Sequence, residues 1–151
     1  MKIRQNSLTL SYFLIIIKTI LLLTTSLALA NENKIGSVTE LKGTIVAITD
    51  ELEERDLLIH DPIFLNEEIF VSEGSSATIQ FEDNTAIIMK ELTSLNVNEF
   101  ENSKKNPKIK AKLLKGKITI ESGSIAKNSN GEMLVDILTS SLGLRGTRVE
   151  I

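Results

Sequence analysis

Hydrophobic and polar residues alternate with a period of two along most of the chain. The alternation is clearest at residues 77–81, 95–98, 108–113, 117–121 and 133–138. A period of two places every second side chain on the same face, which is typical of a β-strand with one buried face. We therefore predict an all-β domain of about ten short strands, folded as a jelly-roll-like or β-solenoid-like sandwich.

Polar segments with turn-forming residues separate these strands. Asp83-Asn84 predicts a hairpin between residues 77–81 and 85–89, because both residue types tolerate a left-handed backbone. "NSKKNP" at 102–107 and "NSNG" at 128–131 predict polar turns, and "DELEERD" at 50–56 predicts a charged loop.

One short sequence occurs twice in similar form. "LKGTI" at 41–45 resembles "LKGKI" at 114–118. We interpret both as hairpin bends in which glycine supplies a positive φ at little steric cost. An internal duplication is the alternative, and a single five-residue match is weak support for it.

The first 30 residues differ from the rest of the chain. A basic start at Lys2 and Arg4 precedes an apolar region over 12–23, and Ala28-Leu29-Ala30 follows. A charged start, an apolar middle and a small-residue cleavage site together predict a secretory signal peptide at residues 1–30. The mature domain would then be residues 31–151, exported to the periplasm or the cell envelope.

The alternative is an uncleaved anchor helix over residues 12–30, in the inner membrane with the domain facing the periplasm. This stretch is nearly long enough to span a bilayer. Lys18 within it would cost roughly 2.5–3.5 kcal/mol near the bilayer centre. We therefore favour cleavage, and we expect contact with the membrane only if residues 12–30 remain.

Composition and charge exclude several classes of function. The chain has no cysteine, which rules out disulfides, thiolate metal sites and cysteine nucleophiles. Three of its 17 basic groups lie in residues 1–30, so residues 31–151 carry 14 basic and 20 acidic groups, a net charge of −6. Nucleic acid is not an expected partner, because it requires a basic face.

The residues that usually perform catalysis lack suitable neighbours. His60 is the only histidine, and we interpret it as a turn residue beside Asp61-Pro62. The acidic run at 50–56 lacks the glycine-centred spacing of a calcium loop. No serine lies in a G-x-S-x-G motif, and no phosphate-binding glycine loop is present. We predict no catalytic, cofactor or metal residue, and rank an enzyme acting on envelope polymers last.

Three lysines lie on one face of a single predicted strand: Lys108, Lys110 and Lys112. They could bind an anionic polymer or a lipid head group. Alternatively, they could protect an exposed strand against pairing at a sheet edge, and we favour this second interpretation. Under the first interpretation, the three lysines are a candidate partner surface.

The order of these segments resembles the FecR-type periplasmic domain family over roughly residues 35–151. The central segment at 72–97, "SEGSSATIQFEDNTAIIMKELTSLNV", is similar to that family's strand, acidic turn and second strand. "LLKGKITIESG" resembles a later strand, and "ILTSSLGLRGTRVEI" resembles the family's ending. The resemblance assigns these residues to a family signature of structural character: Phe81, Asp83, Thr139, Gly143, Arg145, Gly146 and Thr147.

The resemblance implies an all-β domain that works outside the inner membrane. In the namesake regulators, such a domain receives a signal from an outer-membrane transporter and passes it to a cytoplasmic segment that controls a sigma factor. Here residues 1–11 are too few for that segment, and tryptophan is absent. We therefore expect a stand-alone, non-enzymatic binding module with a protein or envelope polymer as partner. The alternative is a membrane-anchored regulator.

The last residues carry a second set of expectations. We interpret Gly143 and Gly146 as positions where the backbone bends or another strand comes close. We expect the guanidinium of Arg145 to pair with backbone carbonyls or a carboxylate between strands, although it could instead face an anionic partner. Alternation at Val149 and Ile151 predicts a final paired strand. If its edge is open, a partner or a second copy could add a strand, giving a strand-pairing homo-oligomer.

Overall fold

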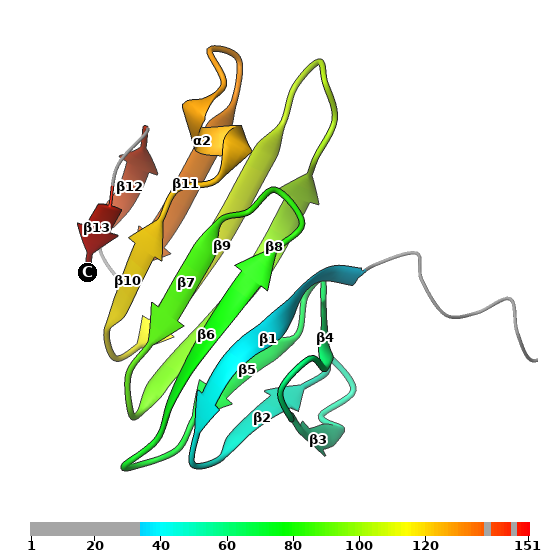
Figure 1. The fold of residues 1–151 in the computed structure, drawn as a ribbon, viewed down its shortest axis with the longest axis vertical. Helices are drawn as coiled ribbons and strands as arrows, with labels where there is room; N and C mark the ends of the chain where they lie inside the picture. The colour runs from blue at the N-terminus through cyan, green and yellow to red at the C-terminus, as the bar shows by residue number, and fades with distance from the viewer. Residues whose placement is uncertain (1–33, 138–139, 146–147) are drawn as a thin grey trace, which may run out of the picture. The chain divides into compact units, whose positions relative to one another are not determined.

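The protein forms two β-sheets packed face to face (Figure 1). The structure is a computed structural model that describes residues 34–137, 140–145 and 148–151, all within a compact unit spanning residues 33–151. The predicted all-β sandwich is confirmed. The predicted signal peptide or anchor at residues 1–30, together with Thr139, Gly146 and Thr147, lies outside the described residues.

Sheet A has six strands, and all its neighbouring strands pair antiparallel. From one edge to the other they are β13 (Arg148–Glu150), β10 (Ile118–Glu121), β7 (Ala86–Met89), β6 (Ser76–Phe81), β1 (Lys34–Lys42) and β4 (Pro62–Phe64). The final strand expected around Val149 is confirmed as β13, which pairs with β10.

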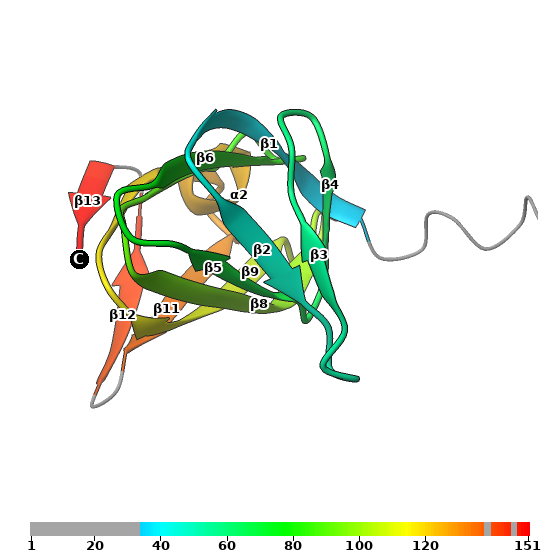
Figure 2. The same ribbon diagram turned by 90° about the horizontal axis from the view of Figure 1, so that it is seen from below.

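Sheet B has seven strands, and one of its pairs, β9 with β11, is parallel. From one edge to the other they are β12 (Ser140–Leu144), β11 (Glu132–Ile137), β9 (Lys108–Lys115), β8 (Thr93–Glu101), β5 (Glu68–Val71), β2 (Ile45–Ile48) and β3 (Glu54–Asp56). Figure 2 shows β12 and β13 together on one side of the sandwich, with β3 and β4 on the other.

The described residues contain thirteen strands, three more than the approximate number expected. One of the additional elements is β3, which occupies the end of the predicted loop at 50–56 and pairs with β2. A four-residue helix, α2 (Ser124–Lys127), follows Gly123 and was not predicted. These segments are too short for alternation to reveal them, because a strand of three residues contains hardly more than one period of two residues.

The core consists of the inward-facing residues of both sheets. On β6 and β7, Ala77, Ile79, Phe81, Ile87 and Met89 are each at most 2% exposed. The predicted hairpin joins these two strands, and Asn84 at its turn has the left-handed φ of 67°. Burial of alternate side chains thus follows the alternation in the sequence, because successive residues of a strand point to opposite faces.

The two similar segments around Gly43 and Gly116 are not hairpin bends. β1 and β2 do not pair with each other; Gly43 lies where the chain passes from sheet A to sheet B. Gly116 lies where it passes from sheet B back to sheet A, between β9 and β10. The expected positive φ is nevertheless present, at 82° and 92° respectively.

Each of these glycines packs against a hydroxyl-bearing residue on a neighbouring segment. The Thr44 N–H donates to Ser75 Oγ at 3.0 Å, and the Lys117 N–H donates to Thr93 Oγ1 at 3.1 Å. A Cβ on Gly43 would lie 2.2 Å from Ser75 Oγ, and one on Gly116 would lie 2.4 Å from Thr93 Oγ1. Both corners therefore require glycine for its missing side chain as well as for its φ.

The pairing pattern describes two long hairpins that each bend across both sheets. β1 and β2 pair with β6 and β5, and β7 and β8 pair with β10 and β9. Gly43 lies on the outgoing limb of the first hairpin, whereas Gly116 lies on the returning limb of the second. The two "LKG" segments therefore occupy different places in the chain path, so their similarity reflects corner geometry and gives no support to a duplication.

No helix within the described ranges is long and apolar enough to cross a membrane.

Candidate functional site

Asp83 forms the centre of a buried polar cluster at the β6–β7 turn. It is 1% exposed, and Thr85 is fully buried. Asp83 Oδ1 accepts a hydrogen bond from the Thr85 N–H at 2.9 Å. Oδ2 accepts from the Thr85 hydroxyl at 2.8 Å and from the Ile125 N–H at 3.1 Å. A buried carboxylate thus joins its own turn to the first residues of α2.

Gly123 completes this cluster from the other side. Its N–H donates to Thr85 Oγ1 at 3.0 Å, and the Ser124 N–H donates to the Asp83 carbonyl at 2.8 Å. A Cβ at Gly123 would lie 2.3 Å from the Thr85 nitrogen and 2.4 Å from the Asp83 carbonyl oxygen. Because both side chains of the turn are already bonded and no Cβ fits, this cluster is packed as a structural joint with no space for a ligand.

Phe81, another residue of the predicted signature, lies in the core. It is 2% exposed, and its ring meets the ring of Phe100 edge-on, with centroids 5.8 Å apart and planes at 63°. Phe81 therefore connects sheet A with β8 of sheet B through apolar contact.

The lysine row lies within sheet B, and its interpretation as protection of a sheet edge is wrong. β9 has β8 on one side and β11 on the other. The sequence could not reveal this position, because β11 lies beyond β10 and α2 along the chain and pairs with β9 in parallel.

Neighbouring strands supply carboxylates to these lysines. Lys108 Nζ lies 3.2 Å from Glu99 Oε2 and 3.7 Å from Glu132 Oε2, and Lys110 Nζ lies 3.4 Å from Asp136 Oδ2. Lys112 has no such pair among the described residues. An anionic partner would therefore have to compete with the protein's own carboxylates for Lys108 and Lys110.

Two groups on this face have shifted pKa values. A hydrogen bond to Glu99 and the charge of that carboxylate, followed by the charge of Glu132, raise the pKa of Lys108 above 10.5. A hydrogen bond from the Ser141 hydroxyl, followed by the charge of Lys110, lowers the pKa of Asp136 below 3.8. In both cases the charged form is favoured.

Arg55 and Glu67 form a clamp that the sequence did not reveal. Arg55 Nε and Nη2 donate to the two carboxylate oxygens of Glu67 at 3.1 and 2.8 Å. Nη2 also donates to the Pro62 carbonyl at 2.7 Å, and the guanidinium carbon lies 5.4 Å from the centroid of the Phe64 ring. Glu67 is 6% exposed and also accepts from the Phe64 N–H at 3.0 Å. The sequence offered one signal of this clamp: Arg55 is the only basic residue within the acidic run at 50–56.

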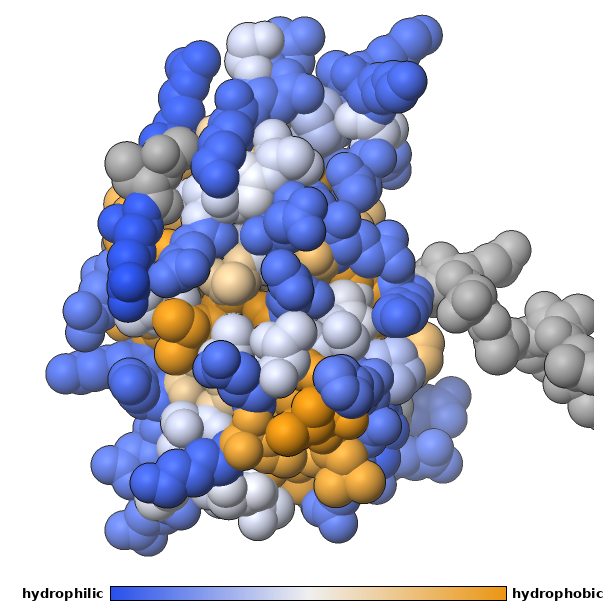
Figure 3. Space-filling view, viewed as in Figure 1, coloured by the Kyte–Doolittle hydropathy of each residue, from blue (hydrophilic) through white to orange (hydrophobic). Residues whose placement is uncertain are grey.

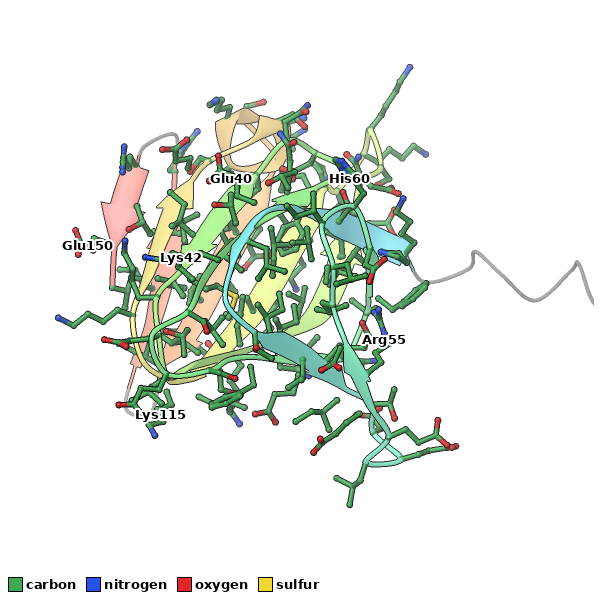
Figure 4. All side chains as sticks on the ribbon, turned by 60° about the horizontal axis from the view of Figure 1, so that its bottom comes forward. Glu40, Lys42, Arg55, His60, Lys115 and Glu150 are labelled. Atoms are coloured by element: carbon green, nitrogen blue, oxygen red, sulfur yellow. The ribbon has the colours of Figure 1, made fainter. Side chains whose placement is uncertain are left out.

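This clamp ties β3, β4 and the start of β5 together on one side of the sandwich. Figure 4 shows Arg55 on that side and Glu150 of β13 on the opposite side. A bidentate pair between Arg and carboxylate fixes geometry as well as adding energy. The clamp therefore closes the sandwich where β3 and β4 form its edges.

The remaining candidates are exposed. His60 is an exposed turn residue, as expected, with φ 76°, and its N–H donates to the Val38 carbonyl at 2.8 Å. Arg145 is exposed, and no hydrogen bond or ion pair of its guanidinium is found with the described residues. Within the same residues, no group of three or more His, Asp or Glu side chains could hold a metal ion.

Gly143 does not have the close neighbour that was expected of it. It lies in β12 opposite Leu134, and a Cβ there would lie 3.8 Å from Leu134 Cδ2, an ordinary contact. Its φ is outside the left-handed region. The interpretation of Gly143 as a bend or close approach is therefore wrong, whereas that of Gly146 lies outside the described residues.

The face shown in Figure 3 is largely hydrophilic, with an apolar area in its lower part, over the region of β1, β2 and β3. Two strongly exposed apolar residues, Leu58 (65%) and Ile59 (48%), lie in the β3–β4 loop. Leu52, between β2 and β3, is 82% exposed. These side chains are separate from the Asp83 cluster and from the lysine row.

Comparison with known proteins places the chain in a family. No curated protein matches it. One solved structure, described as "Cell surface anchoring domain", is 32% identical; the match covers 41% of this chain and 82% of that chain with a TM-score of 0.40. Residues 67–151 match the family described as "FecR protein". That match covers more than half of the chain and contains β5 to β13, so the chain belongs to the FecR family.

Proposed function

We propose that this chain is a non-enzymatic binding or interaction domain of the bacterial cell envelope. The observation that carries the proposal is the family match over residues 67–151. The matched segment includes Phe81, Asp83, the lysine row and β12. The expected partner is a protein or an envelope polymer, and no catalytic or cofactor role is assigned to any residue.

The geometry of the signature residues supports this function. Asp83 and Thr85 bond to each other and to the start of α2, and Phe81 is in the core. Residues used in this way build the fold and leave binding to the surface. We assign the outer face of sheet B, with Lys108, Lys110 and Lys112, as the surface for an anionic polymer.

Lys112 gives this assignment its sharpest test, because it is exposed and has no ion pair among the described residues. We expect Lys112→Glu to weaken retention on an anionic polysaccharide column, with the same salt series for both proteins. Lys127→Glu, on α2 and also exposed, is the matched control and should elute with the unchanged protein. Equal elution of all three would remove the lysine row as a binding surface.

Cell fractionation tests the location. We expect the tagged full chain outside the cytoplasm, with a mature N-terminus at Asn31. Recovery of the whole chain in the cytosol would contradict the envelope function.

A membrane-anchored regulator of the FecR type is the second candidate. The apolar stretch at residues 12–30 favours it. In this case the protein would keep its first residues and remain in the membrane pellet after alkaline carbonate extraction. A start at Asn31 would exclude this candidate without affecting the first one.

A further inference from the structure

The two sheets end in four edge strands, and three of these have protection against pairing with another chain. β3 presents Glu54 and Asp56. β4 begins with Pro62, which has no N–H to donate. β13 presents Arg148 and Glu150. Each of these strands has only three residues, and shortness, charge and proline are the devices by which proteins block open edges.

β12 has none of these devices. It consists of Ser140–Leu144, "SSLGL", with five residues, no charge and no proline. It pairs with β11 on one side and has no neighbour on its other side among the described residues. An uncharged strand of this length at an open edge presents unpaired backbone groups to any complementary strand.

The apolar inner face of sheet B reaches the surface at this edge. Leu142 lies opposite Val135, which is fully buried, and Leu144 lies opposite Met133, which is 1% exposed. Leu142 therefore belongs to the inward-facing side, yet it is 37% exposed. A strand added beside β12 would cover Leu142 and extend the core.

Charge limits which occupants fit this edge. The domain is acidic, so two copies repel each other across most of their surfaces. β12 is an edge without carboxylates, and the nearest one, on Asp136, is balanced by Lys110 at 3.4 Å. A basic segment of another protein would instead fit the acidic edge at β3.

We propose that β12 pairs antiparallel with β12 of a second copy, with Leu142 facing Leu142 across a two-fold axis. The two copies of sheet B then form one continuous sheet. Because the interface uses the same strand on both copies, it closes as a dimer. The interface is small, so the association is weak and depends on concentration.

The absence of cysteine allows a direct test by disulfide capture. Residues directly opposite in an antiparallel pair have Cβ atoms about 4.5–5.5 Å apart, close to the spacing that a disulfide requires. We expect purified Leu142→Cys to form a disulfide dimer at least tenfold faster than Leu52→Cys under the same oxidant. Leu52 is the matched control, because it is an exposed leucine on the opposite side of the sandwich.

Sedimentation equilibrium supplies a second measurement. We expect the unchanged protein to dimerise at high concentration, and Leu142→Lys to weaken the dimer at least tenfold while Leu52→Lys does not. Circular dichroism melts of both variants check that the fold is kept. A monomer at every concentration, together with equal oxidation rates for the two cysteine variants, would overturn the proposal.

The same variant distinguishes self-pairing from capture of a different strand. If Leu142→Cys in whole cells joins to another protein and never to itself, the homodimer is wrong. The proposed dimer goes beyond the proposed envelope function, and its test does not depend on that function. The tests of location and of polymer binding can fail while the dimer is found. Equally, those tests can succeed while the protein is found to be a monomer.

Discussion

At the scale of single residues, Asp83 shows how one buried carboxylate organises two distant segments. Its side chain accepts hydrogen bonds from Thr85, two residues away, and from Ile125, 42 residues away. A buried charge is tolerated only when donors surround it, because desolvation would otherwise be prohibitive. The β6–β7 turn and α2 are therefore mutually dependent.

We expect Asp83→Ala to lower the free energy of unfolding by about 3 kcal/mol, because it leaves the Thr85 and Ile125 donors without their acceptor. Urea unfolding followed by far-ultraviolet circular dichroism measures the change, since the chain has no tryptophan. The control is Glu82→Ala at the exposed neighbour, which should stay within about 0.5 kcal/mol of the unchanged protein. Equal losses for both variants would contradict the role of Asp83.

The sequence indicated that Asp83-Asn84 forms a turn, and Asn84 indeed has the left-handed φ. It could not show that Asp83 is buried, because that depends on α2, whose four residues carry no helical periodicity. The Arg55–Glu67 clamp was missed for a similar reason: Arg55 lies in β3, Glu67 lies between β4 and β5, and the acidic run around Arg55 was interpreted as a loop.

At the scale of elements, the corners between the sheets depend on glycine and hydroxyl pairs. Gly43 packs on Ser75, and Gly116 packs on Thr93. In each pair the hydroxyl oxygen accepts a hydrogen bond from the backbone N–H of the residue after the glycine, at 3.0 Å for Ser75 and 3.1 Å for Thr93. Each pair lets two antiparallel strands turn together from one sheet into the other.

We expect Gly116→Ala to destabilise the protein by more than about 2 kcal/mol, because the new Cβ would meet Thr93 and the φ is left-handed. Gly143→Ala, in a strand with space for a Cβ, should be neutral or slightly stabilising. Thermal melts of the two variants provide the comparison. If both lose the same stability, the corner geometry described for Gly116 is incorrect.

Glycine at these corners was predictable from "LKG", but the strands it joins were not. A positive φ is a local property, whereas the pairing of β1 with β6 and of β2 with β5 depends on contacts across the whole sandwich. Similarly, alternation was enough to predict which residues of β9 face inward and which face outward. It could not predict that β9 lies inside sheet B, because that position depends on β11, which pairs with β9 only after the chain has crossed sheet A.

At the scale of the whole molecule, the charges on the outer face of sheet B link stability to pH. The pKa of Asp136 is lowered by its hydrogen bond from Ser141, so its contribution to stability is present above pH 3.8 and lost as the pH falls through the lower folded value. The pKa of Lys108 is raised, so its contribution is present below pH 10.5 and lost as the pH rises through the higher folded value. Both side chains are on the surface, so each contribution is small.

We expect Ser141→Ala to bring the pKa of Asp136 back toward 3.8, because the hydroxyl is the first cause of the shift. Carbon-13 titration of the Asp136 carboxyl by NMR follows this directly in both proteins. Lys110→Met, which removes the next cause that lowers the pKa of Asp136, should produce a smaller change in the same direction. Identical titration curves in all three would contradict the assigned hydrogen bond.

The topology of the two bent hairpins has a consequence for folding kinetics. The β6–β7 hairpin joins two strands of the core through residues 82–85 alone, and short loops are closed at little entropic expense. The first bent hairpin must bring Ile45 to Val71, and β11 reaches β9 only after β10 has been placed in the other sheet. We therefore expect folding to begin at the turn next to Asp83 and to reach β12 late. An edge that is completed last is the edge that stays open to another chain for the longest time during folding.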